Sequence, residues 1–186
     1  MKSLFSFIGI CLSSFASVMA VSLISPCHAS GTIRIGMESM PPGNANPHTS
    51  GGWPPIFVWE AFFDTMTALN PNGEIVGELA ESWVNEDNMT WVFRMREGIR
   101  FSNGEPMDAS AAASTIRYLL SEDGRVFSGY RELQTVDYVT VRDPMTLEVK
   151  TKQPDSMIPG RFAGLRIHPP KYFADVGPSA FALAPH

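Results

Sequence analysis

The stretch from residue 90 to residue 101 constrains the fold of this chain more than any other. Residues 90–95 (TWVFRM) alternate in polarity, with Trp91, Phe93 and Met95 on one face. This alternation predicts a half-buried β-strand. Glu97-Gly98 is a turn signal, and residues 99–101 then continue the apolar run. We therefore expect an antiparallel hairpin over residues 90–101.

A helix is predicted directly after a second turn at residues 102–104. Asp108 precedes an alanine-rich run, and its side chain can accept a hydrogen bond from a free backbone N–H of the first helical turn. The helix is expected to run to Leu120, with Ala112, Ile116 and Leu119 facing inward. A strand followed by a capped helix already indicates a chain that mixes the two kinds of element.

The remaining segments are expected to form further strands and helices. By periodicity and turn chemistry, the expected elements are a strand at 32–37, a long loop at 39–55, a helix at 56–66, a turn at 70–73 with a return strand at 74–76, a helical turn at 79–83, strands at 136–141 and 146–151, and a weak helical segment at 154–165. Strands and helices do not alternate regularly, so the fold class is mixed α/β rather than a series of βαβ units.

The N-terminus predicts secretion. Lys2, an apolar run to residue 24 and the small residues before Ser30 have the order of a signal peptide, with cleavage expected after Ala29 or alternatively after Ala20. A retained membrane anchor and a lipid anchor on Cys27 are the alternatives. The expected organisation is a signal peptide at 1–29, followed by a secreted mature part at 30–186. Because both cysteines precede residue 30, no disulfide is expected in the mature chain.

The charge and motifs exclude several classes of protein. Without Lys2, 13 basic residues face 19 acidic ones, a net charge of −6, which argues against nucleic-acid binding. The sequence has no nucleophile elbow, phosphate loop, dinucleotide-binding fingerprint or zinc spacing. The three histidines after the signal peptide, His48, His168 and His186, are far apart in sequence. Neither catalysis nor a cofactor or metal is therefore predicted, and a small secreted enzyme is only a rival hypothesis.

Residues 78–106 carry a resemblance to a known family. They read ELAESW, then a polar turn, then TWVFRMREGIRF and SNGEP. This resembles the signature region of the family 5 extracellular solute-binding proteins, which serve the peptide and nickel importers of the ABC class. Asn46-Pro47-His48 resembles the family's Asp-Pro-His loop, and residues 64–76, 136–150 and 167–172 resemble three further family segments.

The resemblance implies a periplasmic-binding-protein-like fold of type II, with two lobes that close over a ligand. By this resemblance, residues 30–186 would form the N-terminal part of a solute-binding domain in the periplasm. They would make up most of the first part of lobe one, and the second lobe would be absent. A frameshifted gene whose product is a nonfunctional remnant is therefore an alternative expectation.

The same resemblance implies a function in transport. The expected partners are a peptide or other small solute, and the permease and ATP-binding subunits of an ABC transporter. A monomer is expected. The alternative solutes are a nickel chelate, haem, a sugar or an opine.

Candidate ligand-binding residues follow from the same analogy. Met40, Asn44 and His48 lie in the loop after the first strand, which lines the cleft in the family. Tyr130 lies in the loop after the capped helix, where the family often has an aromatic wall. The aromatic residues expected to be structural rather than ligand-binding are Trp83, Trp91, Phe93 and Phe101.

Overall fold

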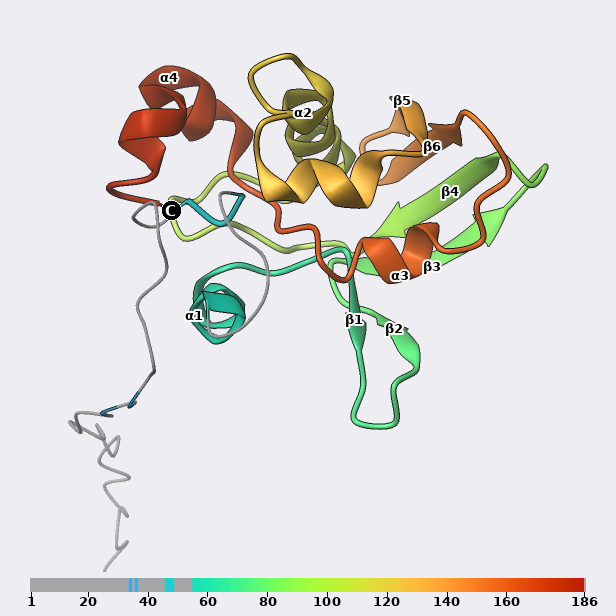
Figure 1. Ribbon diagram of the computed structural model, residues 1–186, viewed down its shortest axis with the longest axis horizontal. Coiled ribbons are helices and arrows are strands. Elements are labelled where there is room, and N and C mark those ends of the chain that lie inside the picture. The colour runs from blue at the N-terminus through green and yellow to red at the C-terminus, as the bar shows by residue number, and fades with distance from the viewer. Residues whose placement is uncertain (1–33, 35, 37–45, 49–54, 186) are drawn as a thin grey trace, which may run out of the picture. The chain divides into compact units, whose positions relative to one another are not determined.

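The core of the fold is a four-stranded antiparallel sheet with the strand order β3-β4-β6-β5 (Figure 1). A computed structural model of the chain describes residues 34, 36, 46–48 and 55–185. The strands of the sheet are β3 (Ala80–Asn85), β4 (Thr90–Met95), β5 (Val136–Asp143) and β6 (Thr146–Thr151). The strands predicted at 90–95, 136–141 and 146–151 are therefore confirmed.

The two faces of this sheet have opposite character. Phe93 pairs with Leu147, and both side chains are fully buried. On the opposite face, Glu148 accepts from Arg142, which also binds Glu86, each ion pair at 2.7 Å. Such alternation is typical of an antiparallel sheet that packs on one side and faces water on the other.

The predicted hairpin partner of β4 is wrong. Both edges of β4 are occupied, by β3 and by β6, so residues 99–101 cannot pair with it. The Phe101 N–H donates instead to the Glu105 carbonyl at 2.9 Å, which closes a separate turn. The helical turn predicted at 79–83 is also wrong, because Trp83 lies in β3 opposite Phe93. The backbone ladder and this aromatic pair, with ring centroids 6.2 Å apart, override a weak local helix preference.

Helix α2 (Ala109–Leu120) confirms the predicted capped helix. The Asp108 carboxylate accepts from the Ala111 N–H at 3.0 Å. Ala112, Ile116 and Leu119 are fully buried, as expected. The alanines have small side chains, so the helix can approach β5 and β6 closely and cover the buried face of the sheet (Figure 1).

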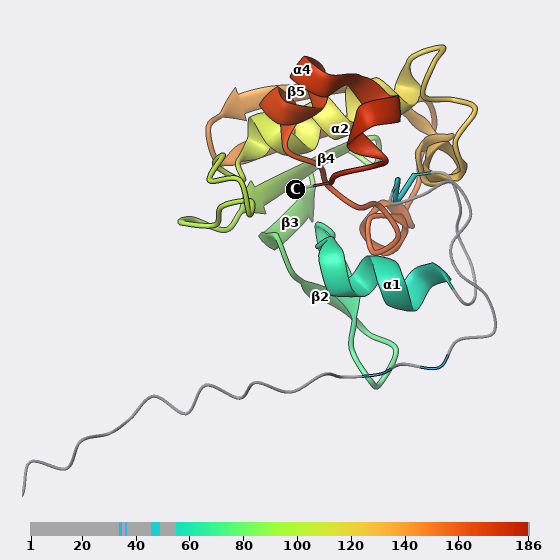
Figure 2. The same ribbon diagram turned by 90° about the vertical axis from the view of Figure 1, so that its left-hand side faces the viewer.

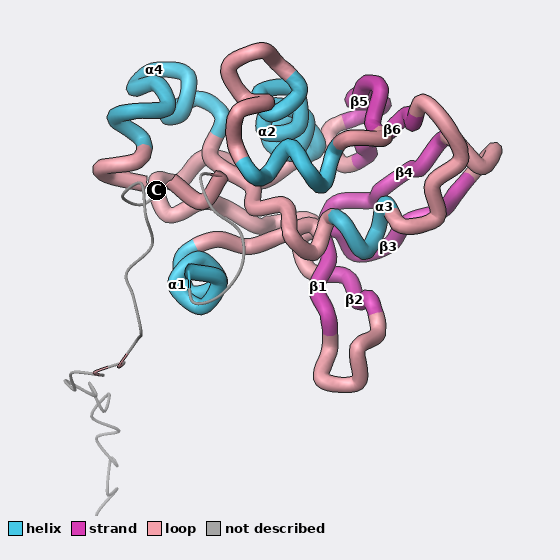
Figure 3. Tube along the Cα trace, viewed as in Figure 1, coloured by secondary structure: helices cyan, strands magenta, loops and turns pink. Residues whose placement is uncertain are grey.

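A second, two-stranded sheet extends away from the first. It consists of β1 (Thr67–Leu69) and β2 (Ile75–Gly77), joined by the turn predicted at 70–73 (Figure 3). The helix predicted at 56–66 forms over α1 (Pro55–Phe62) only. Phe62, expected on its buried stripe, is 72% exposed, because the chain leaves the helix there and continues toward β1.

The C-terminal part departs most from prediction. The helical segment expected at 154–165 is reduced to α3 (Ile158–Arg161), which contains Pro159 and Gly160. A 3₁₀ helix, η1 (Ser128–Leu133), interrupts the expected loop after α2. Helix α4 (Pro170–Phe181) was not predicted, and it is broken at Gly177, where φ is 75°.

Helix α4 is held by packing rather than by local signals. It lies beside α2 (Figure 2). Its Phe173 and Phe181 form a buried cluster with Trp59 and Phe63 from the α1 region. The Glu105 carboxylate accepts from the first free N–H groups of α4, at Lys171 and Tyr172.

Some predictions fall outside the described residues. These are the signal peptide at 1–29, most of the strand at 32–37 and most of the loop at 39–55. Within the part of the chain that the structure describes, no helix is both long and apolar enough to cross a membrane.

Candidate functional site

Arg166 is a buried cation on the segment between α3 and α4. The residue as a whole is only 7% exposed. Its backbone forms an isolated antiparallel bridge with Thr65. The neighbouring Leu165 and Ile167 are buried as well, so packing of this apolar segment carries the arginine inward.

The guanidinium of Arg166 is poorly satisfied. Its Nε has no hydrogen-bond partner among the described residues, and its Nη1 reaches only the Gly164 carbonyl, at 3.5 Å. No carboxylate of the described residues lies within ion-pair distance of it. Burial lowers the pKa of Arg166, and the negative charge of Glu60 partly opposes this effect. A buried charge without a close partner is costly, which makes this side chain unusual.

A cavity of about 380 Å³, here called the Arg166 pocket, opens beside this guanidinium. It combines one cation and two carboxylates with a mostly apolar wall. Its lining residues are Glu60, Phe63, Thr65, Ala68, Leu69, Glu78, Ala163 and Arg166. They come from residues 60–69, which run from α1 into β1, from Glu78 between β2 and β3, and from the chain after α3.

Glu78 is fixed at the wall of this pocket. Its Oε2 accepts from the Thr65 N–H at 3.2 Å and lies 2.5 Å from the Thr65 hydroxyl. The Thr65 hydroxyl also lies 2.6 Å from the Thr67 carbonyl, to which it can donate instead. Both contacts of the Glu78 carboxylate with Thr65 use Oε2. The hydrogen bonds found within the described part of the chain therefore leave Oε1 of Glu78 for other donors.

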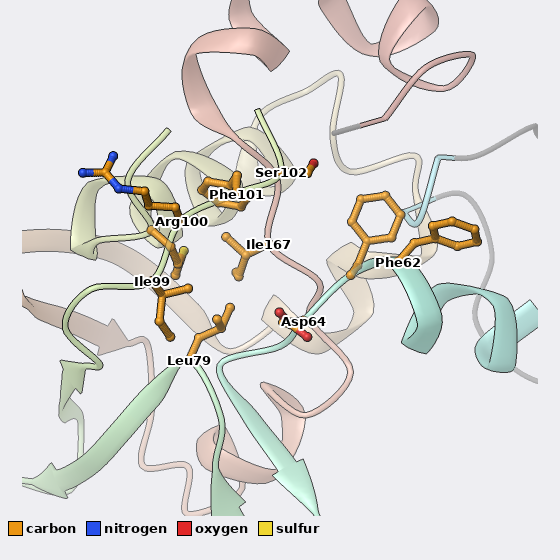
Figure 4. A pocket seen from close by; sticks show the side chains of 10 residues that line it. Phe62, Asp64, Leu79, Ile99, Arg100, Phe101, Ser102 and Ile167 are labelled. Carbon is orange, nitrogen blue, oxygen red and sulfur yellow. The ribbon is translucent and has the colours of Figure 1, made fainter. Parts of the chain in front are cut away.

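A second, smaller cavity of about 120 Å³ is lined by both apolar and polar residues (Figure 4). Leu79, Ile99 and Ile167 surround it, and Asp64 lies at one side (Figure 4). The guanidinium of Arg100 points away from it and donates to the Gly104 carbonyl at 2.9 Å. Its volume is less than a third of that of the Arg166 pocket, so it leaves little room for a solute.

Comparison with known proteins decides the family. The sequence model described as "Bacterial extracellular solute-binding proteins, family 5 Middle" matches residues 74–185, more than half of the chain. The chain belongs to the family 5 bacterial extracellular solute-binding proteins. The resemblance found in residues 78–106 is thereby confirmed.

Individual relatives are similar over stretches of comparable length. The nickel-binding periplasmic protein of Escherichia coli K12 is 37% identical over 100 residues, which cover 51% of this chain and 18% of that protein. The glutathione-binding protein GsiB of Salmonella paratyphi A is 26% identical over 113 residues, 60% of this chain and 21% of that one. The chain thus spans about a fifth of the length of these curated relatives.

Solved structures of the family share the fold. OppA of Burkholderia pseudomallei matches with a TM-score of 0.68 at 21% identity, over 76% of this chain and 32% of that one. NikA of Brucella suis, in complex with Fe(III)-EDTA, matches with a TM-score of 0.61 at 25% identity, over 69% of this chain and 26% of that one. The expected mixed α/β fold of the type II periplasmic binding proteins is therefore confirmed.

The structure separates the candidate residues predicted from the sequence. Met40 and Asn44 lie outside the described residues. His48 is 1% exposed and lines neither cavity. Tyr130 is half-buried in η1, with the guanidinium of Arg125 5.7 Å from its ring centroid. The hydroxyl of Ser128 donates to the His48 carbonyl at 3.0 Å, so His48 and η1 are neighbours. A ligand-binding role for these four residues stays a prediction.

His48 has an unexpected partner. Its Nε2 lies 3.1 Å from Nδ1 of His168, which is fully buried and stacks on Phe173 with ring centroids 3.9 Å apart. Burial, reinforced by the charge of Arg166, lowers the pKa of His48 to about 3, and burial likewise lowers that of His168. The pair is therefore neutral and ties residues 46–48 to the core. The described residues contain no group of three or more potential ligands that could hold a metal ion.

Arg166 was missed by the sequence analysis. The available signal was a single arginine within the apolar segment Phe162 to Pro169, where a charge must be either buried or turned outward. No local pattern distinguishes these two outcomes, because they depend on whether another segment covers the arginine.

Proposed function

We propose that the chain acts in solute capture for an ABC importer, with a peptide or another small solute as ligand. The match of residues 74–185 to the family 5 solute-binding proteins carries this proposal. The type II fold of the described residues supports it. The relatives named above are binding proteins, so the proposed action is non-covalent capture rather than catalysis.

The proposed mode of binding follows from the general physics of extended ligands. Main-chain groups of the protein hydrogen-bond the solute backbone, and aromatic and polar walls select its side groups. The described residues would supply one side of the binding cleft. A permease and an ATP-binding subunit would accept the loaded protein, which we propose to be a monomer exported to the periplasm through residues 1–29.

A nickel chelate is a second candidate solute. The nickel-binding relative from Escherichia coli has 37% identity to this chain, and NikA of Brucella suis was solved with a metal chelate. In this mode the protein would hold the metal through its chelator, whose carboxylates offer groups for hydrogen bonding.

The test is a thermal-shift screen of the purified full-length chain. The panel contains trialanine, longer peptides, glutathione and Ni²⁺ with excess histidine. A ligand at a hundred times its Kd stabilises the folded state by about 2.7 kcal/mol, so binding raises the melting temperature measurably. A peptide shift supports the first solute, and a shift with nickel and histidine but not with either alone supports the second. A flat response to the whole panel contradicts the proposal.

A further inference from the structure

Among the described residues, the Arg166 guanidinium lacks the hydrogen-bond partners that a buried cation requires. A guanidinium has five N–H donors, and the described residues offer this one a single long contact, from Nη1 to Gly164 at 3.5 Å. The residue is nevertheless more than nine-tenths buried. Stability alone does not explain this arrangement, because a well-packed apolar side chain in the same place would avoid the cost of desolvation.

The two carboxylates that line the same pocket, Glu60 and Glu78, form no ion pair with Arg166. Glu60 lines the same pocket, yet it forms no ion pair within 4.0 Å, and its charge acts on the guanidinium only from a distance. Glu78 is held by Thr65 through Oε2. The pocket therefore presents separated groups of opposite sign rather than a closed internal ion pair.

Apart from Thr65, the remaining wall is apolar. Phe63, Ala68, Leu69 and Ala163 line the space between the charged groups. A volume of about 380 Å³ lies within the range of small-molecule sites, which are mostly apolar with a few placed polar groups. Such a pocket suits a compact solute with an anionic group, a short apolar body and a cationic group.

We propose that the Arg166 pocket binds the carboxylate of a small zwitterionic solute, such as a short peptide, through the Arg166 guanidinium. The ammonium group of the same solute lies toward Glu60 and Glu78. This inference rests on the proposed function and specifies its solute class. A planar guanidinium can form two parallel hydrogen bonds with a carboxylate, which satisfies the donors that the protein leaves free.

The first arm of the test changes the solute and leaves the protein intact. Titration calorimetry on the full-length chain compares trialanine with trialanine amide, and glutathione with its diethyl ester. Loss of a hydrogen-bonded carboxylate should weaken binding by about tenfold to a hundredfold. Equal affinity for acid and amide, or binding of nickel with histidine while both acids fail to bind, would overturn the inference and leave the proposed function standing. Failure of the whole panel would remove the proposed function as well.

The second arm changes the protein. Arg166→Met should lose the preference for the acid over the amide, while Arg166→Lys should keep part of it. Arg100→Met is the matched control, because the Arg100 guanidinium is exposed and points away from its cavity, and this variant should keep the full preference. A preference unchanged in Arg166→Met would place the carboxylate elsewhere.

A third arm separates a solute carboxylate from a free anion. Inorganic phosphate is titrated alone and in competition with trialanine. We expect at most weak phosphate binding, because phosphate carries no cation for Glu60 and Glu78. Tight phosphate binding that depends on Arg166, with no acid preference among peptides, would contradict a zwitterion site. If Arg166→Met fails to fold, the comparison of acid with amide on the unmodified protein still decides the question.

Discussion

At the residue scale, two buried polar side chains stand out, because their hydrogen-bond and charge partners must come from distant parts of the fold. Within the described part of the chain, Arg166 has no carboxylate at ion-pair distance, and the buried Nε2 of His168 has no hydrogen-bond partner. His48 and His168 can hydrogen-bond to each other only while at least one ring is neutral, since one ring must accept the proton that the other donates. Each group therefore affects stability in a way that can be measured.

The histidine pair predicts a loss of stability in mild acid. The folded-state pKa of His48 is lowered to about 3 from its ordinary 6.5, and that of His168 is also lowered. Below pH 6.5 the unfolded chain binds more protons than the folded chain, so the free energy of unfolding falls as the pH falls. The expected slope approaches about 1.4 kcal/mol per pH unit for each histidine. Urea denaturation between pH 7.5 and pH 4.5 measures it.

The control for this prediction removes the titrating groups. A His48→Gln/His168→Gln variant should show little pH dependence between pH 6.5 and pH 4.5. The lowered pKa values of Asp87 and Asp143 affect stability only at lower pH, below the ordinary carboxyl range. A variant that kept the full slope above pH 4.5 would show that other groups cause it.

Removal of the Arg166 charge is expected to stabilise the ligand-free protein. Arg166→Met replaces a poorly paired buried cation by an apolar side chain of similar length, which should raise the free energy of unfolding by about 1–3 kcal/mol. Arg100→Met should change it by less than about 0.5 kcal/mol, as for other surface changes. Chemical denaturation without ligand measures both. A destabilised Arg166→Met would mean that the guanidinium has a structural role instead.

At the element scale, the predictions are correct for elements whose sequence signal lies entirely within the element or directly beside it. Helix α2 begins after Asp108, as its cap predicts, and β4 spans the alternating residues 90–95. The partner of β4 was mistaken, because alternation fixes which face of a strand is buried but not which strand lies beside it. Helix α3 is short because Pro159 and Gly160 limit it.

The cap of α2 gives a prediction at this scale. Asp108→Ala removes the hydrogen bond to the Ala111 N–H and should lower the free energy of unfolding by about 1 kcal/mol. Asp108→Ser should recover most of the loss, because serine also caps well. Asp137→Ala, at an exposed position of β5, is the control for the loss of one negative charge. Equal effects of Asp108→Ala and Asp137→Ala would argue against a capping role.

At the scale of the whole molecule, the chain from α3 to α4 connects the sheet to the Arg166 pocket. Phe162 is fully buried against Phe93 of β4, with ring centroids 5.1 Å apart. Four residues further on, Arg166 reaches the bridge with Thr65. Packing on the sheet therefore sets the position of the pocket wall, as expected for a site supported by a rigid scaffold.

This dependence can be tested with two phenylalanines. Phe162→Ala should lower the free energy of unfolding by about 3–5 kcal/mol, because it leaves a cavity against the sheet. Phe62→Ala is the matched control and should cost less than about 0.5 kcal/mol, since Phe62 is 72% exposed. Urea denaturation of the two variants measures the difference. Similar losses would show that the α3 segment is only loosely attached to the sheet.

The sequence by itself determined the elements whose signals are local, and it determined the family. The alternation in β4, the cap of α2 and the hairpin of β5 and β6 depend on neighbouring residues only, so they could be predicted. The tertiary structure alone decided that residues 80–85 form a strand, that 170–181 form a helix, and that His48 meets His168. It also decided that Arg166 is buried beside a pocket. These outcomes depend on which distant segments pack together, and the free energy of such burial has no signature in any short window of sequence.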